Sequence, residues 1–543
     1  MFTLAELPGS LADARSNLSI EIRINSMTDA ATLQQIKLTK IEQAKQAKPG
    51  LAIKDELTTL AQAGWEAMDQ DDLIIRLKFL GLFHRPVTPG KFMLRLRLPH
   101  GILSSQQMQT LAEVVQRYGE DGSADITTRQ NLQLRGIRLE DAPDILAKLK
   151  QVGLTTVQSG HDNVRNITGS PVAGIDPAEY FDTRALATQL QDMITDYGEG
   201  SLEFSDLPRK FNICLEGAPD NSSHVEINDI GFVPAFKDGE FGFNVLVGGY
   251  FSAQRQAEGI PIDVWVPPNE AVLAVSRGIL NLYTRYGAEA GLRGNRAKAR
   301  VLWLVEAWGV DVFRAKLEAE IGDRLETAAP ENAFTMDKRD HIGVYPQKQT
   351  GYSYVGLHVP AGRLTAEDMF EVARLAEIYG SGEIRTTVEE NLIIPYVATE
   401  NVDTLLMEPL LKKFSVNPTP LLRSLVSCTG NRYCNFAMVE TKEQGLALAQ
   451  ALDAELEIPQ RVRMHWTGCP NSCGQAQVGD IGFMGTKAKV AGQMVEAVNI
   501  FTGGTVGRHA SLGSTVAQKV PCGDALKEKV KEILIEQFGA TPK

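Results

Sequence analysis

"LPRKFNICLEGAPDNSSHVEINDIGF" (residues 207–232) and "PQRVRMHWTGCPNSCGQAQVGDIGF" (residues 459–483) are two copies of one pattern, and they decide the fold of this chain. From Pro208 onward the stretches align without a gap at an offset of 251 residues, and both end in Asp-Ile-Gly-Phe. Farther on, "FNVLVGGY" in the first half matches "VNIFTGGT" in the second. Repeats over such a length indicate one duplicated unit. The sequence therefore predicts two related halves around a pseudo-twofold axis.

A second pair of matching stretches lies upstream, "FMLRLRLPHG" (92–101) and "YSYVGLHVPAG" (352–362), at an offset of 261 residues. Each leads into a predicted helix that begins with a capping box, Ser-x-x-Gln in one half and Thr-x-x-Asp in the other, and ends at Tyr-Gly. A predicted strand follows each helix, "ITTRQNLQL" (126–134) or "RTTVEENLII" (385–394). Each half therefore reads as strand, helix, strand.

The composition is that of a globular protein. The chain has 543 residues, of which 43% are hydrophobic and 22% charged, which suits three or four domain-sized units. No apolar run approaches the ~20 residues that a membrane-spanning helix needs. A net charge of −12 argues against bulk binding of nucleic acid.

The first residues carry acids early and lack both a basic leader and an apolar secretory core. We therefore expect a cytoplasmic protein. Met27 opens a second plausible beginning, "MTDAATLQQIKLTKIEQAKQAK" (27–48), which predicts the first helix of the fold. Residues 1–26 are expected to be dispensable.

Six cysteines are too few for a disulfide scaffold, and a cytoplasmic chain keeps them reduced. Cys214 and Cys522 stand alone, and each is expected to be a small buried apolar side chain. The other four form a C-x5-C pair and, 34 residues later, a C-x3-C pair: Cys428 and Cys434, then Cys469 and Cys473. Structural zinc sites favour tighter spacings, so the pattern favours an iron–sulfur cluster over zinc, with coincidence left open.

The two halves differ where chemistry is expected. Cys469 and Cys473 overlie Ala218 and Ser222 of the first half. Three arginines of the first half lack a counterpart in the second: Arg95 overlies Gly356, Arg129 overlies Glu389, and Arg165 overlies Val426. Thiolates on one side of the axis and guanidinium groups on the other suit a redox centre that faces a small anion.

More cations belong to the first half. In the strand 92–98 the leucines alternate with Arg95 and Arg97, and Arg129 and Arg135 are placed on the neighbouring strand. The run "LRGNRAKARVLWLVEAWG" (292–309) predicts a helix with three arginines on one face, at positions 293, 296 and 300. A solvated basic face is the alternative for either segment. Together these cations suit a polycarboxylate cofactor and an anionic substrate.

The chain lacks the glycine-rich nucleotide motifs, a His-Glu-x-x-His zinc motif and an evident serine triad. A redox enzyme without its own nucleotide domain takes its electrons from another protein. The sequence therefore indicates a small electron carrier as partner.

"SCTGNRYC" (427–434) together with "TGCPNSC" (467–473) resembles the cysteine motifs of the sirohaem and [4Fe–4S] nitrite and sulfite reductases. The resemblance covers nearly the whole chain beyond Met27, including the duplication. Within that family the chain is most similar to the ferredoxin-dependent assimilatory nitrite reductases. It implies reduction of nitrite to ammonium by six electrons from reduced ferredoxin.

The resemblance also implies roles for individual residues. All four paired cysteines would ligate the cluster, and Cys473 would also be the axial ligand of the sirohaem iron. The substrate contacts carried over are Arg95, Arg165, Lys210 and Asn212. The sirohaem contacts carried over, to which we add three cations of the 292–309 run, are Arg129, Gln133, Arg135, Arg209, Thr467, Asn471, Arg296, Lys298 and Arg300.

Three alternatives stay open at this point. A ferredoxin-dependent sulfite reductase is the nearest, and it resembles this chain except for a lysine where Asn212 stands. A non-catalytic iron–sulfur electron-transfer protein leaves the concentrated arginines unexplained. A zinc-stapled binding protein is disfavoured by the cysteine spacings.

For the architecture we expect an α+β protein that is internally duplicated and has one pseudo-twofold axis. Residues 80–155 and 346–420 form a composite ferredoxin-like module from the two repeats. Two α/β domains follow, 156–345 on the cationic side and 421–543 with the four cysteines, and residues 1–79 form an extension. We expect a monomer without integral membrane association.

Overall fold

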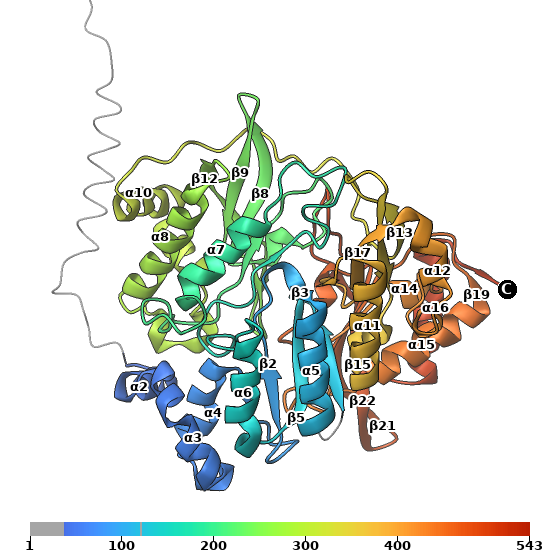
Figure 1. Cartoon of the computed structure of the whole chain (residues 1–543), viewed down its shortest axis with the longest axis horizontal. Helices are drawn as coiled ribbons and strands as arrows, with labels where there is room; N and C mark the ends of the chain where they lie inside the picture. Colours follow the sequence, from blue (N-terminus) through green and yellow to red (C-terminus); the bar gives the residue numbers. More distant parts are fainter. Residues whose placement is uncertain (1–36, 120–121) are drawn as a thin grey trace, which may run out of the picture.

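A computed structural model of the chain describes residues 37–119 and 122–543 (Figure 1). The prediction that residues 1–26 are dispensable lies outside this range. The helix predicted over 27–48 is described only in part: α2 spans Lys40–Ala47 and begins at Thr39, whose side chain accepts a hydrogen bond from the Glu42 amide.

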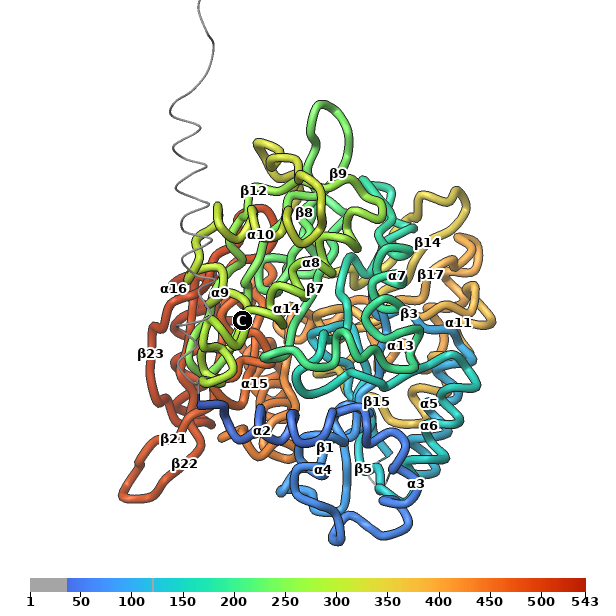
Figure 2. Tube along the Cα trace, turned by 90° about the vertical axis from the view of Figure 1, so that its left-hand side faces the viewer, coloured from blue at the N-terminus to red at the C-terminus, as the bar shows by residue number. Residues whose placement is uncertain are grey.

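Short helices open the described chain and pack against the side of the molecule (Figures 1 and 2). Helix α3 (Ile53–Ala63) buries Ile53, Leu57 and Ala61, which are four residues apart and therefore share one face. These side chains join the same hydrophobic core as Leu94 and Leu134 of the following sheet. The remaining helical segments of this region are η2 (Gly50–Ala52), η3 (Trp65–Ala67), α4 (Gln70–Ile74) and η4 (Arg76–Leu80).

The two upstream repeats form the predicted elements and one more. Helices α5 (Ser105–Tyr118) and α11 (Ala366–Tyr379) each begin with the predicted capping box, which confirms both helix starts. The strand predicted after each helix is wrong as a single element, because the structure has a hairpin there. In the first half the hairpin is β4 (Ser123–Thr127) with β5 (Asn131–Ile137), and in the second it is β16 (Glu383–Thr386) with β17 (Leu392–Ala398).

The hairpin turns reverse the chain through residues in the left-handed region. Gln130 has φ 48° and Glu390 has φ 64° at equivalent positions of the two turns. Neither residue type favours that conformation, so local sequence gave no turn signal. Arg129, predicted within a strand, therefore lies in the turn between β4 and β5.

The halves exchange strands, which fuses them into one module. Strand β3 (Ile102–Ser104) of the first half pairs with β16 of the second, and β15 (Arg363–Thr365) pairs with β4 of the first. The two sheets have the orders β1-β2-β5-β4-β15 and β13-β14-β17-β16-β3. Their other strands are β1 (Leu82–Phe83), β2 (Phe92–Arg95), β13 (Gly343–Pro346) and β14 (Tyr352–Leu357). One hydrophobic core serves both halves.

Each half continues into a second five-stranded sheet with the same mixed topology. The first has the order β12-β9-β8-β7-β6 and the second β18-β20-β21-β22-β23. In each, three strands pair in parallel and two more join antiparallel. The strands of the first are β6 (Thr168–Gly169), β7 (Ile213–Leu215), β8 (Ile230–Lys237), β9 (Glu240–Val247) and β12 (Ile260–Val266). Those of the second are β18 (Leu425–Ser427), β20 (Met464–Thr467), β21 (Ile481–Val490), β22 (Gln493–Thr502) and β23 (Ser514–Pro521).

Helices cover these sheets, and each sheet has its own hydrophobic core. The longer helices on these sheets are α7 (Arg184–Thr195), α8 (Glu270–Tyr286), α9 (Val301–Trp308), α10 (Val310–Ile321), α15 (Lys442–Glu455) and α16 (Asp524–Phe538). Helix α6 (Ala142–Gln151) packs instead in the core of the composite module. The hairpin of β21 and β22 extends away from the body of the molecule (Figure 2). Among the described residues, no helix combines the length and the apolar character needed to cross a bilayer. The domain boundaries given above stay a prediction.

The pseudo-twofold axis passes between two equivalent residues. His224 and Gln475 are related by the repeat, both are left-handed, and His224 Nδ1 lies 2.8 Å from Gln475 Oε1. A second related pair, Asn221 and Ser472, is left-handed as well, with φ 46° and 49°. The duplicated loops therefore keep their backbone shape although their side chains have diverged.

The helix predicted over 292–309 begins only at Val301. Leu292–Gly294 and Arg296–Lys298 are separate short 3-10 turns, because the Asn295 side chain accepts a hydrogen bond from the Ala297 amide and starts the second turn anew. The three arginines therefore do not share one helical face, because each of them belongs to a different local element.

We predict that Gly362→Ala destabilises the protein more than Gly351→Ala does. Both glycines have positive φ, 65° and 85°, so alanine at either costs ~1–2 kcal/mol in backbone conformation. A Cβ at Gly362 would also lie 2.7 Å from the Glu390 side chain in the hairpin turn, which adds ~1–3 kcal/mol, whereas Gly351 faces open space. Thermal unfolding temperatures of the two variants measure the difference. Equal losses would contradict the close approach of Gly362 to the hairpin turn at Glu390.

Candidate functional site

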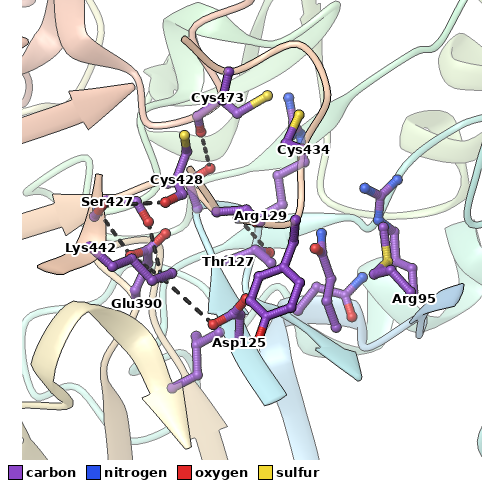
Figure 3. A pocket seen from close by; sticks show the side chains of 18 of the residues that line it. Arg95, Asp125, Thr127, Arg129, Glu390, Ser427, Cys428, Cys434, Lys442 and Cys473 are labelled. Atoms are coloured by element: carbon purple, nitrogen blue, oxygen red, sulfur yellow. Dashed lines mark hydrogen bonds and ion pairs between the residues drawn. The ribbon is translucent and has the colours of Figure 1, made fainter. Parts of the chain in front are cut away.

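The four paired cysteines meet in one cavity between the composite module and the two α/β sheets (Figure 3). The cavity encloses about 990 Å³, part of it open to solvent. Its walls come from β2, the β4–β5 hairpin, and the loops after β18 and β20. Figure 3 shows Cys428, Cys434 and Cys473 gathered at one end and Arg95 on another wall.

Parallel pairing of β18 with β20 explains why distant cysteines come together. Ser427 lies beside Trp466 in this pair, so the loops with Cys428 and Cys469 leave the sheet at the same edge. The second loop then turns tightly at Gly474, where a Cβ would lie only 1.9 Å from the Trp466 carbonyl oxygen. Each cysteine pair, C-x5-C or C-x3-C, therefore lies in one of two loops that leave the sheet side by side.

The thiol environment suits a bound metal centre. Burial and the neighbouring thiols raise the pKa of Cys428 to about 12, and burial also raises the pKa of Cys469. Backbone and side-chain donors point at the sulfurs: the Gly468 amide is 3.2 Å from Cys428 Sγ and Asn471 Nδ2 is 3.5 Å from Cys469 Sγ. Such thiols become thiolates only with strong positive charge beside them, which a metal centre supplies.

Four cations of the first half line this cavity or a smaller one that adjoins it. Arg95 ends β2, Arg129 lies in the hairpin turn, Arg165 lies in the loop before β6, and Lys210 precedes β7. Within residues 37–119 and 122–543, none of the four forms an ion pair. Burial, followed by repulsion from neighbouring arginines, lowers the pKa of Arg165 and Lys210 well below their usual values and that of Arg95 to about 9. The wall therefore fits an anionic ligand.

Most of the residues proposed from the sequence line this cavity or the smaller one that adjoins it. Those on the larger cavity are Arg95, Arg129, Gln133, Arg135, Arg165, Thr467 and the four cysteines, and those on the smaller one include Lys210 and Asn471. Five proposed residues line neither: Arg209, Asn212, Arg296, Lys298 and Arg300.

Comparisons with known proteins decide the family. A model described as the nitrite and sulphite reductase 4Fe-4S domain matches residues 160–325 and 419–538, and a model of the nitrite/sulfite reductase ferredoxin-like half domain matches 84–152 and 345–411. The chain belongs to the nitrite and sulphite reductase family. The duplicated architecture expected from the sequence is thereby confirmed.

Relatives within the family are similar over nearly their whole length. The chain is 56% identical to a ferredoxin–nitrite reductase of Synechococcus elongatus, over 94% of this chain and 98% of the relative. It is 48% identical to the chloroplastic ferredoxin–nitrite reductase of Zea mays, over 92% of this chain and 90% of the relative. The solved structure of the NirA protein of Mycobacterium tuberculosis superposes with a TM-score of 0.83, 28% identity, and coverage of 92% and 93%.

The cofactors of this nitrite and sulphite reductase are sirohaem and a [4Fe–4S] cluster. The residues of the cavity have the chemistry that both groups require, although no three Cys, His, Asp or Glu side chains of the described chain lie close enough together to hold a metal ion as they stand. Four thiols without disulfide partners are the donor set that such a cluster requires. Partly buried cations that form no ion pair within the described residues fit a macrocycle that carries carboxylates.

Two of the residues proposed to contact the cofactor already form an ion pair with an acid, although only one of them lines the cavity. Arg135 lies on the cavity, but its Nη2 is 2.6 Å from Asp125 Oδ2 and it also donates to Thr429 Oγ1. Arg300 is buried in an ion pair with Asp229. Their charges are therefore partly neutralised before any ligand binds.

Asn212 does not line either cavity, but its side chain is hydrogen-bonded to Arg129, which does. Its Oδ1 accepts a hydrogen bond from Arg129 Nε at 3.2 Å, and its backbone amide donates to Asp229 at 2.7 Å. The side chain therefore orients Arg129. Asp229 in turn fixes Asn212 together with Arg300.

A buried acid gathers several of the other cations. Arg296 donates to both oxygens of Asp162 at 2.6 and 2.8 Å, and Arg209 and Lys45 lie 3.7 and 3.6 Å from that carboxylate. These cations hold the N-terminal helix α2 against the domain. Lys298 is exposed and lies 5.2 Å from the Trp303 ring.

Sequence reasoning missed several residues of the cavity. Lys442 is buried, donates to the Ser427 carbonyl at 3.1 Å, and has Asp125 and Glu390 within 4 Å (Figure 3). Burial raises the pKa of Glu390 to about 7. Arg85 also lines the cavity. The repeat held a usable signal for Glu390, because this charged residue overlies the neutral Gln130.

The two lone cysteines differ from each other. Cys214 is buried as expected, and burial raises the pKa of its thiol to about 12. Cys522 is only partly buried, so the expectation of a buried side chain is wrong for it. Neither cysteine lines the cavity.

We predict that Asp162→Asn destabilises the protein strongly and Asp206→Asn only slightly. Both acids pair with Lys45, but the Asp162 side chain is fully buried whereas that of Asp206 is 58% exposed. Removing the buried acid leaves Arg296 uncompensated, which costs ~3–5 kcal/mol, against ~1 kcal/mol or less for the exposed acid. Thermal unfolding of the two variants at neutral pH measures this. Equal losses would show that the buried Asp162 does not stabilise the cations around it.

Proposed function

We propose that this protein reduces nitrite to ammonium with electrons from reduced ferredoxin. The observation that supports this most is that Arg95, Arg129 and Arg165, which are partly buried and form no ion pair within the described residues, share one cavity with the four cysteine thiols. Lys210 lines the smaller cavity that adjoins it. The overall reaction joins one nitrite, six electrons and eight protons to give one ammonium ion and two water molecules. A cationic wall serves an anionic substrate, and a thiol-bound redox centre serves electron delivery.

In this proposal Cys428, Cys434, Cys469 and Cys473 hold the cluster, and Cys473 also ligates the sirohaem iron. When bound, the two cofactors pass electrons singly from the donor to the substrate. The cavity residues with an amide, guanidinium or hydroxyl group would hold the macrocycle: Arg129, Gln133, Arg135, Thr467 and Asn471. Arg209, Arg296, Lys298 and Arg300 lie outside both cavities, so their proposed contacts have weaker support.

Arg95, Arg165 and Lys210 bind the nitrite anion in this proposal. They are partly buried cations around the two adjoining cavities, and none of them forms an ion pair with a carboxylate of the described chain. Hydrogen bonds from charged donors strengthen as negative charge builds on the substrate oxygens. These side chains also hold protons beside the oxygens that leave as water.

Asn212 bears on the choice between nitrite and sulfite. Sulfite near neutral pH is partly a dianion, whereas nitrite is a monoanion. A lysine at this position, as in similar sulfite reductases, would add one cation, worth about 1–3 kcal/mol of preference for the higher charge. The neutral Asn212, through its bond to Arg129, favours the monoanion.

The ferredoxin donor would approach the loop that carries Cys434. This loop reaches the surface, where Phe436 is 55% exposed and the Arg432 side chain is 54% exposed. An exposed aromatic residue and a cation beside the cluster ligand fit an acidic partner, although the chain as a whole has a net charge of −12.

We also propose that the protein acts in the cytoplasm as a monomer. One chain supplies both the cationic wall and all four cysteines, so the site needs no second subunit. Six unpaired cysteines fit a reducing compartment.

Steady-state turnover of the holoenzyme with reduced ferredoxin tests the proposal, with nitrite and sulfite offered separately. We expect a much larger kcat/KM for nitrite, with ammonium as product. Asn212→Lys should shift the ratio toward sulfite by about tenfold, in line with ~1.4 kcal/mol of added attraction. Asn212→Met removes the same bond to Arg129 without adding charge, so it should lower both rates and leave the ratio unchanged.

The outcomes separate the claims. Wild-type preference for sulfite would keep the fold and cofactors but overturn the substrate. An unchanged ratio in Asn212→Lys would remove Asn212 from the account of selectivity. Absence of turnover on both anions by protein loaded with both cofactors would overturn the proposed activity.

A further inference from the structure

Arg97 lies two residues after Arg95 but does not line the cavity. The side chain is 2% exposed, and within the described ranges it forms no ion pair with an acid. Burial lowers the pKa of its guanidinium to about 10, which leaves it charged at neutral pH. Burying a cation without a carboxylate costs free energy unless hydrogen bonds compensate the charge. The hydrogen bonds of Arg97 therefore indicate its role.

The guanidinium donates to three backbone carbonyls of one loop. Nη1 is 3.1 Å from the Gln158 oxygen and 2.8 Å from the Val164 oxygen, and Nη2 is 3.3 Å from the Arg165 oxygen. Nε donates to the Gln191 side chain at 3.3 Å. Arg97 therefore joins the beginning and the end of the loop 158–165.

This loop has no regular secondary structure to hold its shape. Gln158 and His161 both have positive φ, 56° and 51°. The Arg165 guanidinium donates back into the loop, to Ser159 O at 2.6 Å and His161 O at 2.7 Å. The direction of the Arg165 side chain therefore depends on the path of the loop backbone that Arg97 fixes.

The same backbone is tied to the neighbouring wall residues. The Arg165 amide donates to the Phe211 carbonyl at 2.7 Å, and the Phe211 amide donates to the Asn163 carbonyl at 3.1 Å. Phe211 lies between Lys210 and Asn212 in the sequence. A shift of the loop would therefore move the wall residues on both sides of this contact.

We propose that Arg97 is a positioning residue of the substrate wall, which sets the place of Arg165 and, through the Arg165–Phe211 backbone bonds, that of Lys210. The inference rests on the proposed binding of nitrite at this wall. Arg97 touches neither substrate nor cofactor. It acts by holding three carbonyls at once, which a planar guanidinium does and the compact ammonium of lysine does not.

Arg385 offers a control of similar burial, which differs from Arg97 in that its Nε also pairs with Glu383 at 2.6 Å. It is equally buried, and it donates to two backbone carbonyls, Pro171 O at 3.1 Å and Ala173 O at 2.7 Å. Its carbonyl partners lie outside the loop 158–165, and it does not line the cavity. Arg385→Lys therefore reports the general cost of replacing a buried arginine.

The test compares wild type, Arg97→Lys and Arg385→Lys as holoenzymes. Optical titration of the oxidised enzyme gives the dissociation constant for nitrite, and titration of the reduced enzyme gives that for carbon monoxide, a neutral haem ligand. We expect Arg97→Lys to weaken nitrite binding about tenfold and to leave carbon monoxide binding unchanged. Hydrogen–deuterium exchange should speed up in the segment 158–165 of this variant, and Arg385→Lys should show neither effect.

Other outcomes would overturn the inference. Equal weakening of nitrite by both variants, or loss of sirohaem from Arg97→Lys, would assign Arg97 to general stability. Unchanged nitrite binding in Arg97→Lys, with wild type binding nitrite normally, would remove its positioning role. Failure of the wild-type holoenzyme itself to bind nitrite would overturn the proposed function instead, and the exchange measurement would still show whether Arg97 orders the loop.

Discussion

Partly buried cations that form no ion pair within the described residues, gathered around two adjoining cavities, are the constraint on which the rest of this structure depends. Arg95, Arg129, Arg165 and Lys210 repel one another and have lost much of their hydration, which is unfavourable unless an anion joins them. The surrounding architecture holds them in place despite this. Buried carboxylates such as Asp162 and Asp229 stand behind the wall and bind the outer cations, so that the inner ones face the cavity. The wall is therefore shaped for a ligand that carries negative charge.

Duplication supplies the frame, and divergence makes it a single site. On the second-half side of the axis, Glu389 takes the place of Arg129 and forms an ion pair with Lys338. His224 lies 3.6 Å from the same carboxylate, and Lys338 also donates to the Ser222 carbonyl at 2.7 Å, at the position equivalent to Cys473. The related space is thus filled by paired side chains. The chain keeps one cavity in which cations of the first half meet thiols of the second.

Features carried by short-range patterns could be predicted from the sequence. The capping boxes and the duplication depend on spacing alone, and the structure has them where expected. The four cysteines of the two spaced pairs line one cavity. The hairpin turns could not be predicted, because Gln130 and Glu390 adopt a left-handed conformation that their residue types disfavour. The helix predicted from residue 292 onward was wrong for a related reason, since the Asn295 side chain starts a separate turn inside it.

Roles that depend on tertiary contacts were also out of reach. Arg97 looks like Arg95 in an alternating strand, yet its bonds go to a loop more than sixty residues away. Asn212 is expected to touch the substrate, and the sequence did not indicate that its side chain also accepts a hydrogen bond from Arg129. Lys442 and Glu390 belong to the cavity only because strand exchange brings the second hairpin beside the loop of Cys428.

The claim that four cysteines from two loops hold one redox centre is tested most directly by iron and acid-labile sulfide analysis of Cys434→Ser beside Cys522→Ser. Both residues are partly exposed, but only Cys434 lines the cavity. The account predicts that Cys522→Ser keeps ~4 cluster iron atoms per chain and that Cys434→Ser loses most of them. Full cluster content in Cys434→Ser, or equal loss in both variants, would contradict it.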